Sequence, residues 1–187
     1  MVKRIFDLIL ALGLIVLFSI PMLVIATLIR LMSKGPAVFW TDRVGENNRI
    51  FKMAKFRTMK LDTPQVATHL MEDPKRYLIS AGEFLRKYSI DELPQLFNVL
   101  RGEMSFVGPR PALFNQDDLV GLRTKKNIHK LIPGVTGWAQ INGRDDLAIP
   151  VKVAFDEYYL QHRSFAFDLY IIFLTAIKVL KREGVQH

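Results

Sequence analysis

Two adjacent carboxylates, Asp91 and Glu92, stand in the stretch SIDELPQLFNVLRG, which covers residues 89–102. Ser89 precedes Glu92 by three residues and fits a capping box, and the apolar residues that follow predict a helix that Gly102 ends. Capping explains Ser89 and Glu92 but does not require Asp91. Because a helix N-terminus keeps a carboxylate ionised, Asp91 could instead serve as a nucleophile or a magnesium ligand. Both interpretations stand at this point.

Several basic residues along the chain could bind a phosphate beside these carboxylates: Lys55, Arg57, Arg86 and Arg110. Arg110 lies between two prolines, whose fixed backbone limits where its guanidinium can go. Such a pre-positioned planar donor suits a phosphate. The alternative is that the basic residues contact lipid headgroups, which is the better interpretation for scattered lysines but not for Arg110.

The composition of the 187-residue chain joins two opposed properties, since 50% of its residues are hydrophobic while its net charge is +8. A protein at an anionic membrane surface can use both. The absence of cysteine excludes disulfides, thiolate nucleophiles and thiolate zinc sites. The four histidines lack metal-ligand spacing, which argues against a histidine metal site.

The apolar residues are concentrated at the N-terminus, where no charge occurs from Leu8 to Ile29. This run is long enough to cross a bilayer as a helix. Ser19 and Pro21 interrupt it near the middle, and basic residues flank both ends. Equal flanking charge favours a re-entrant helix-break-helix hairpin over residues 1–34, with both ends on the cytoplasmic face. A straight span is the alternative; a cleaved signal peptide is disfavoured because no small-residue cleavage site follows.

The remaining residues, 35–187, predict one catalytic domain on the cytoplasmic face, mostly α with a small β element. Residues 38–59 are typical of a hairpin, 82–87 of a helix, 106–111 of an extended segment, and 133–143 of a turn and a short strand. The apolar segment 169–181 is too short to span a bilayer comfortably and is typical of an interfacial amphipathic helix, with Asp168 as its N-cap.

Three ordered motifs resemble those of the bacterial sugar transferase family, the monotopic phosphoglycosyl transferases of the small catalytic-core type. They are KFRTM at residues 55–59, SIDELPQLFNVLRGEMSFVGPRP at 89–111 and PGVTGWAQINGR at 133–144. The resemblance begins at KRIFD, residues 3–7, and reaches the C-terminal FLTAIKVLKR. One departure is Ile20, which separates Ser19 from Pro21 where family members commonly have serine directly followed by proline.

The resemblance implies transfer of a sugar-1-phosphate from a UDP-sugar to polyprenol (undecaprenyl) phosphate, giving polyprenyl-diphosphate-sugar and UMP. It implies Asp91 as the nucleophile that forms a phosphosugar intermediate, and Glu92 as the residue that helps place Mg²⁺. The candidate substrate contacts are Lys55, Arg86, Arg110 and Arg144, with Asp156 and Asp168 supporting the site. It also implies a monotopic protein on the cytoplasmic face of the bacterial inner membrane. The sugar, the polyprenol, the glycan pathway and whether a homodimer forms stay open.

Two rival functions are consistent with the same residues. A hydrolase of lipid-linked diphosphates would use the same carboxylate and metal. A membrane-anchored basic module would bind nucleic acid or lipid without catalysis, but no aromatic-basic nucleic-acid motif accompanies the positive charge. The sequence therefore predicts UDP-sugar, polyprenol phosphate and membrane lipids as partners, and no nucleic acid.

Overall fold

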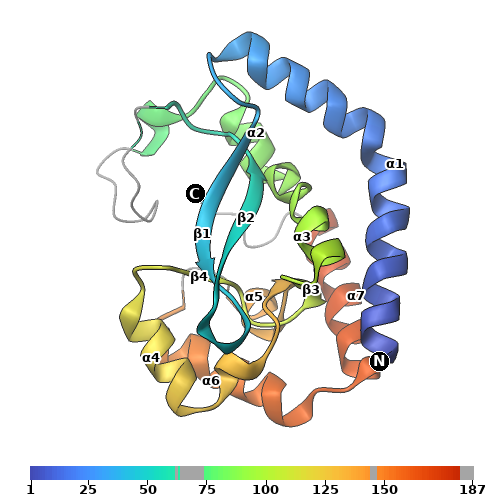
Figure 1. The fold of residues 1–187 in the computed structure, drawn as a ribbon, viewed down its shortest axis with the longest axis vertical. Coiled ribbons are helices and arrows are strands. Elements are labelled where there is room, and N and C mark those ends of the chain that lie inside the picture. The colour runs from blue at the N-terminus through green and yellow to red at the C-terminus, as the bar shows by residue number, and fades with distance from the viewer. Residues whose placement is uncertain (62, 64–73, 144–146, 182–187) are drawn as a thin grey trace.

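The computed structural model describes residues 1–61, 63, 74–143 and 147–181, which are mostly helical with two small sheets, as the sequence predicts (Figure 1). The helices are α1 Val2–Met32, α2 Gly82–Lys87, α3 Gln95–Arg101, α4 Asp117–Lys125, α5 Trp138–Ile141, α6 Ile149–His162 and α7 Phe165–Lys181. The strands are β1 Val38–Val44, β2 Ile50–Phe56, β3 Ser105–Val107, β4 Ala112–Leu113 and β5 Gly134–Thr136. Short 3₁₀ turns cover Glu46–Asn48, Pro74–Tyr77, Ile90–Glu92 and Ile128–Lys130.

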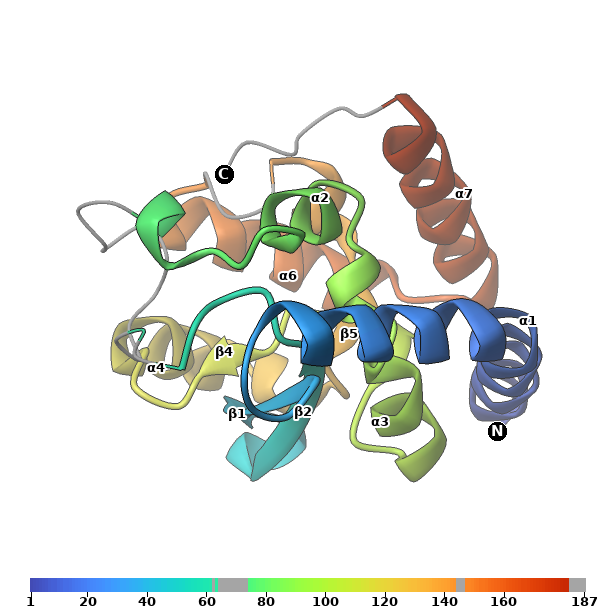
Figure 2. The ribbon, with the colours of Figure 1, turned by 90° about the horizontal axis from the view of Figure 1, so that it is seen from above.

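Helix α1 contains the apolar N-terminal run and is long and apolar enough to cross a membrane. Figures 1 and 2 show that it bends partway along its length. Pro21 lies inside the helix without an N–H to donate, and Ser19 Oγ donates to the Val16 carbonyl at 2.8 Å, which together account for a bend. The helical backbone continues from Val2 to Met32 without the predicted break. Re-entry into one leaflet stays a prediction.

One stripe of α1 packs against the rest of the chain. Ala11 joins the main hydrophobic core, and Ile29 joins a second core with Phe56 and Leu85. The exposed side chains of α1 are large and apolar, among them Leu12, Val16, Leu17, Ile20, Leu23, Val24 and Leu31. A continuous apolar surface of this kind is unfavourable in water, which makes α1 a candidate membrane segment.

The predicted hairpin is confirmed as the antiparallel pair β1–β2, with Val38 opposite Phe56 and Val44 opposite Ile50. The fully buried Asn98 of α3 fastens this hairpin to the helix. Its Oδ1 accepts from the Ala54 N–H at 3.0 Å, and its Nδ2 donates to the Lys52 carbonyl at 2.8 Å. Asn98 therefore pairs with β2 backbone groups that have no strand beside them on that edge. These bonds fix the position of Lys55 relative to the segment that bears Asp91.

A second, parallel pair joins β3 to β5, and the segment 108–111 leads from β3 to β4, which pairs with β1. The prediction that residues 106–111 have an extended backbone is consistent with this path. The prediction of a strand that continues to residue 143 is wrong, since residues 138–141 form α5. The Trp138 ring packs against Tyr158 and Phe167, so contacts with α6 and α7 decide the local structure.

Helix α7 contains the apolar C-terminal segment, with Ile171 buried and Leu169, Tyr170 and Phe173 exposed. Asp168 is not its N-cap, contrary to the prediction. Ser164 fills that position, because its Oγ accepts from the Phe167 N–H at 3.1 Å. The Asp168 carboxylate turns inward and contacts other helices. An interfacial location of α7 stays a prediction.

Candidate active site

The two carboxylates lie in a 3₁₀ turn, Ile90–Glu92, that precedes α3 rather than belonging to it. Ser89 adopts a left-handed backbone (φ 54°) and its side chain caps nothing, so the predicted capping box is wrong. Helix α3 begins only after Pro94, because proline lacks an N–H and suits a helix start. Gly102 ends the helix with φ 84°, as predicted. The 3₁₀ turn leaves both carboxylates available for other partners.

Glu92 is held by two cations. Its Oε1 accepts from Lys55 Nζ at 2.7 Å and from Arg110 Nη2 at 3.2 Å, and its side chain is 17% exposed. Burial raises the pKa of Glu92, but the charges and hydrogen bonds of Lys55 and Arg110 outweigh that effect and hold the pKa well below its ordinary value. Glu92 is therefore a fixed negative charge that joins strand β2 to the segment after β3.

Asp91 has the opposite electrostatic character. It is 7% exposed, and its nearest Lys55 contact, from Oδ2 to Nζ, is 3.9 Å and longer than a hydrogen bond. Burial raises the pKa of Asp91 above its ordinary value, and the charge of Glu92 adds to this, while Lys55, Arg86 and Arg110 oppose it. Two neighbouring carboxylates thus differ in proton affinity, which is a pattern typical of catalytic pairs.

Arg86 completes the positive surroundings of Asp91. Its Nε donates to Thr58 Oγ1 at 2.9 Å, and its charge lowers the pKa of Asp91. Burial lowers the pKa of Arg86 itself, while Asp91 opposes the shift. The structure therefore gathers Lys55, Arg86 and Arg110 around the carboxylate pair. Three cations exceed the two carboxylates in charge, so the site attracts a further anion such as a diphosphate.

Arg57 lies outside this cluster. It is 4% exposed, and its guanidinium donates to the Ser33 carbonyl at 2.8 Å and the Lys34 carbonyl at 2.6 Å. These bonds hold the segment that follows α1. Strand alternation would place Lys55 and Arg57 on one face, but β2 ends at Phe56, and the carbonyls that follow α1 bind the Arg57 guanidinium. Arg144, another predicted contact, lies outside the described residues.

Asp156 supports the site through Arg123, a residue that the sequence reasoning missed. Arg123 donates to Asp156 Oδ2 from Nε at 2.9 Å and from Nη2 at 2.6 Å, and its Nη1 donates to the Arg110 carbonyl at 2.8 Å. Burial raises the pKa of Asp156, and Arg123 opposes that shift. Arg123 shares a buried face of α4 with Leu119, four residues earlier, and a charge on an apolar face was the available signal.

Replacing Asp156 with asparagine should destabilise the protein by at most about 3–5 kcal/mol, because Arg123 would stay buried without its counter-charge while removal of the buried Asp156 charge offsets part of that cost. The Arg110 backbone would also lose part of its support. Thermal unfolding in detergent measures the stability change. Asp117→Asn, at an exposed position on α4, is the matched control and should change the midpoint little. Equal midpoints for the two variants would contradict the assigned role of Asp156.

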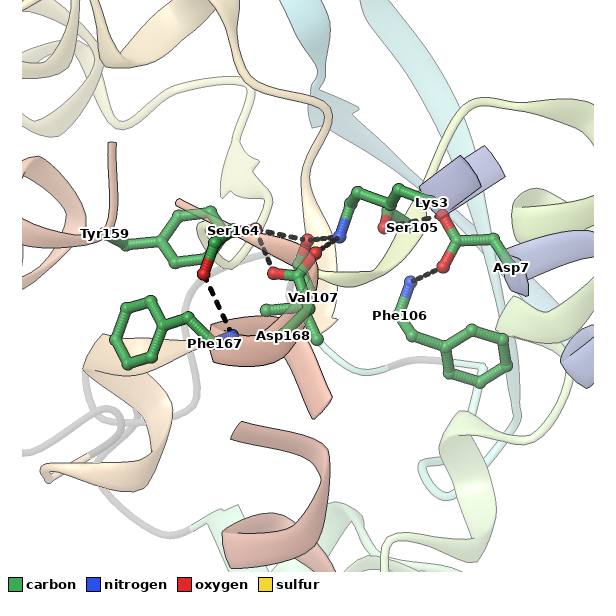
Figure 3. Close-up of polar contacts among 9 residues, drawn as sticks. All are labelled: Lys3, Asp7, Ser105, Phe106, Val107, Tyr159, Ser164, Phe167 and Asp168. Atoms are coloured by element: carbon green, nitrogen blue, oxygen red, sulfur yellow. Dashed lines mark hydrogen bonds and ion pairs between the residues drawn. The ribbon is translucent and has the colours of Figure 1, made fainter. Parts of the chain in front are cut away.

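The structure places Asp168 between helices, where it contacts Lys3 and Tyr159 (Figure 3). Its Oδ2 accepts from Lys3 Nζ at 2.7 Å, and its Oδ1 accepts from the Tyr159 hydroxyl at 2.6 Å. Burial raises the pKa of Tyr159, and the hydrogen bond to Asp168 adds to the shift. Asp168 therefore joins α1, α6 and α7, and its predicted role in supporting the site stays a prediction.

The carboxylate pair is also the candidate metal site. Within the described ranges, no group of three or more histidine or acidic side chains could hold a metal by itself. Mg²⁺ is commonly held by one or two carboxylates together with substrate phosphates and water. Asp91 and Glu92 supply that number of oxygen ligands, so the residues present fit a magnesium ion that binds together with a diphosphate.

Comparisons with known proteins show which family the chain resembles over its length. The chain is 43% identical over 186 residues to the sugar transferase EpsL of Bacillus subtilis (strain 168), and the match covers 90% of the length of EpsL. It is 39% identical over 186 residues to the UDP-glucose:undecaprenyl-phosphate glucose-1-phosphate transferase of Escherichia coli (strain K12), and 38% identical over 192 residues to the UDP-N-acetylgalactosamine-undecaprenyl-phosphate N-acetylgalactosaminephosphotransferase of Aeromonas hydrophila.

These matches cover 95% and 99% of the present chain but 40% and 45% of the two enzymes, so the chain spans less than half of their length. The family described as bacterial sugar transferase matches residues 1–182, which contain the whole charged cluster. The chain belongs to the bacterial sugar transferase family.

Proposed function

We propose that this protein transfers a sugar-1-phosphate from a UDP-sugar to polyprenol phosphate and releases UMP. The observation that carries the proposal is the buried position of Asp91 among Lys55, Arg86 and Arg110, whose charges favour the ionised carboxylate. Transfer at phosphorus depends on a positioned nucleophile and on cations that neutralise charge. The names of two relatives, which specify undecaprenyl-phosphate as acceptor and UDP-linked sugars as donors, support the substrate classes.

The proposed reaction has two displacements at one phosphorus atom. In the first, an Asp91 oxygen forms a bond to the sugar-bearing phosphorus, and the bond to the bridging oxygen breaks, so UMP leaves with the electron pair. In the second, a phosphate oxygen of polyprenol phosphate attacks that phosphorus, and the Asp91 carboxylate leaves. Asp91 and Glu92 would hold Mg²⁺, which would supply charge neutralisation at the diphosphate. Lys55 and Arg110 keep Glu92 ionised and in place throughout.

The assay that decides the function incubates the purified membrane protein with UDP-sugars and undecaprenyl phosphate and follows UMP and the lipid product. Transfer predicts that UMP forms, that the phosphosugar-protein adduct accumulates without acceptor, and that chelation of divalent cations stops turnover. Acceptor-independent release of free sugar phosphate would favour the hydrolase. Turnover that is undiminished by chelation would exclude the magnesium role.

We also infer that α1 is a re-entrant anchor that keeps the site at the cytoplasmic surface of the bacterial inner membrane. One substrate is water-soluble, while the phosphate of the other stays at the lipid boundary, so a site beside a membrane helix reaches both. The bend and the exposed apolar face of α1 support this placement. The exposed apolar side chains of α7 would then lie in the interface.

The topology predicts that residues 3 and 34 are accessible from the same side of the membrane. Single cysteines at these positions in the cysteine-free chain allow the measurement with a membrane-impermeant maleimide in intact cells and in inverted vesicles. Both cysteines should react only in inverted vesicles. Reaction of the two cysteines from opposite sides would establish a straight span and exclude the re-entrant hairpin.

A further inference from the structure

Strand β3 is bonded to the first turns of α1 by two side chains, Lys3 and Asp7 (Figure 3). They stand four residues apart and therefore on one face of the helix. Asp7 is 3% exposed, although it introduces the longest apolar run of the chain. An ionisable side chain buried at this position is unfavourable unless its hydrogen bonds are satisfied.

Asp7 takes the place of a neighbouring strand beside β3. Its Oδ2 accepts from Ser105 Oγ at 2.8 Å, and its Oδ1 accepts from the Phe106 N–H at 3.3 Å. The pairing of β3 with β5 joins Ser105 to Gly134 and Val107 to Thr136, which leaves Phe106 facing the opposite edge. Lys3 Nζ adds a bond to the Val107 carbonyl at 3.1 Å. Helix α1 therefore fixes the free edge of β3.

The chain that follows β3 has little freedom before it reaches Arg110. The Gly108 N–H donates to the Thr136 carbonyl, and the Gly134 N–H donates to the Pro109 carbonyl, both at 2.9 Å. A Cβ atom on Gly108 would lie 2.3 Å from the Ile132 carbonyl oxygen, so the backbones at Gly108 and Ile132 are already closely packed. A shift of β3 would consequently move Arg110 and its contact with Glu92.

We propose that Asp7 is a positioning residue for Arg110, so that the docking of the membrane helix sets the geometry of the carboxylate pair. This inference rests on the proposed function. Docking alone does not need a buried carboxylate. Arg4, in the first turns of α1, already binds the C-terminal end of α3, donating to the Val99 carbonyl at 2.6 Å and the Leu100 carbonyl at 2.9 Å. Asp7 is directed at the strand that leads to Arg110.

A double-mutant cycle with Asp7→Ala and Arg110→Ala measures this coupling in the full chain reconstituted in lipid. Asp7→Ala should lower kcat/KM for the UDP-sugar by about tenfold or more in the presence of Arg110. It should lower kcat/KM less than about twofold in the Arg110→Ala background, because the group it positions is gone. Equal fold losses in the two backgrounds would overturn the proposal.

Arg4→Ala is the matched control, since it removes a docking contact of the same helix that does not involve β3. Its effect should be additive with that of Arg110→Ala. Ser105→Ala removes one hydrogen bond to Asp7 without changing α1, and it takes the place of Asp7→Ala if that variant does not fold. The reduction of kcat/KM by Ser105→Ala should likewise depend on the presence of Arg110. Additive effects of Ser105→Ala and Arg110→Ala would count against the proposal.

Amide hydrogen exchange gives a readout that does not depend on the reaction. Asp7→Ala should accelerate exchange at the Gly108 amide, which is protected by Thr136, while Arg4→Ala should not. If the native chain transfers no sugar phosphate but Asp7→Ala still accelerates exchange at Gly108, the proposed function is contradicted and the positioning of the Arg110 segment by Asp7 stands. Unchanged exchange at Gly108 in Asp7→Ala would remove the positioning role whatever the activity.

Discussion

Asp91→Asn is expected to reduce sugar-phosphate transfer by at least about 10⁴-fold, because an amide cannot form the bond to phosphorus that a carboxylate forms. The substitution preserves the size of the side chain and leaves the ion pairs of Glu92 with Lys55 and Arg110 in place. UMP release at saturating UDP-sugar measures the loss. Mass spectrometry of the intact protein without acceptor should show the phosphosugar adduct in the native chain and none in the variant.

The same substitution should leave the protein equally stable or more stable at neutral pH. Burial raises the pKa of Asp91, so the folded state favours the protonated form. The stability that protonated Asp91 contributes is present below the unfolded pKa and is lost as the pH rises through the folded pKa. Asparagine is neutral at every pH and does not lose it. Its advantage in unfolding temperature should therefore grow from acid to neutral pH.

Asp42→Asn is the matched control, because Asp42 is an exposed acid whose partner, Lys52, is also exposed. It should change neither transfer nor adduct formation. Full activity in Asp91→Asn would remove the nucleophile assignment. A large loss of activity accompanied by a lower unfolding temperature would instead mean that the substitution had damaged the fold.

The parts of the fold that the sequence predicted are those that local signals decide. The hairpin of residues 38–59 contains a polar loop between apolar segments, and helix Gly82–Lys87 lies at the predicted residues. Gly102 ends α3 because it adopts a left-handed backbone that glycine tolerates. In each case the deciding interactions join residues close together in the chain.

The errors occur where a distant partner competes with a local one. Glu92 fits the capping box, but its carboxylate binds Lys55, which is 37 residues earlier and carries a full charge. Asp168 fits an N-cap, but Lys3 and Tyr159 hold its carboxylate. Spacing along the chain cannot reveal such partners, since they depend on how the elements pack.

The same reason explains why the site was found only in part. Residue types and spacing made Asp91, Lys55, Arg86 and Arg110 candidates, and resemblance gave these residues and Glu92 their roles. The structure brings the five together. Arg123 and Asp7 were not assigned roles because their links to Arg110 run through backbone groups: Arg123 donates to the Arg110 carbonyl, and Asp7 contacts β3, where it accepts from the Phe106 N–H as well as from the Ser105 hydroxyl. Any residue type supplies a backbone carbonyl or N–H, so the residue types of these partners leave no pattern in the sequence. The one available signal was the charge of Arg123 on a buried helix face.

Glu92→Gln should reduce transfer by about 10²–10³-fold, because it removes the charge that holds Lys55 and Arg110 in place. It should also destabilise the fold by about 3 kcal/mol at neutral pH, since two partly buried cations would lose their counter-charge. Glu157→Gln, which breaks a surface ion pair with Lys126, is the control and should change stability by less than about 1 kcal/mol.

The dependence on pH separates the two roles of Glu92. Its folded pKa lies below the ordinary value, so the stability from its ion pairs is present above the unfolded pKa and is lost as the pH falls through the folded pKa. The stability difference between Glu92→Gln and the native chain should therefore shrink in acid.

The pH dependence of the residual activity of Glu92→Gln gives a separate test. The Glu92 charge raises the pKa of Asp91, so its removal should move the acid limb of the pH–rate profile to lower pH. An acid limb that does not move would show that the limb belongs to a group other than Asp91, because no ionisable group this close to Glu92 could be insensitive to the loss of its charge.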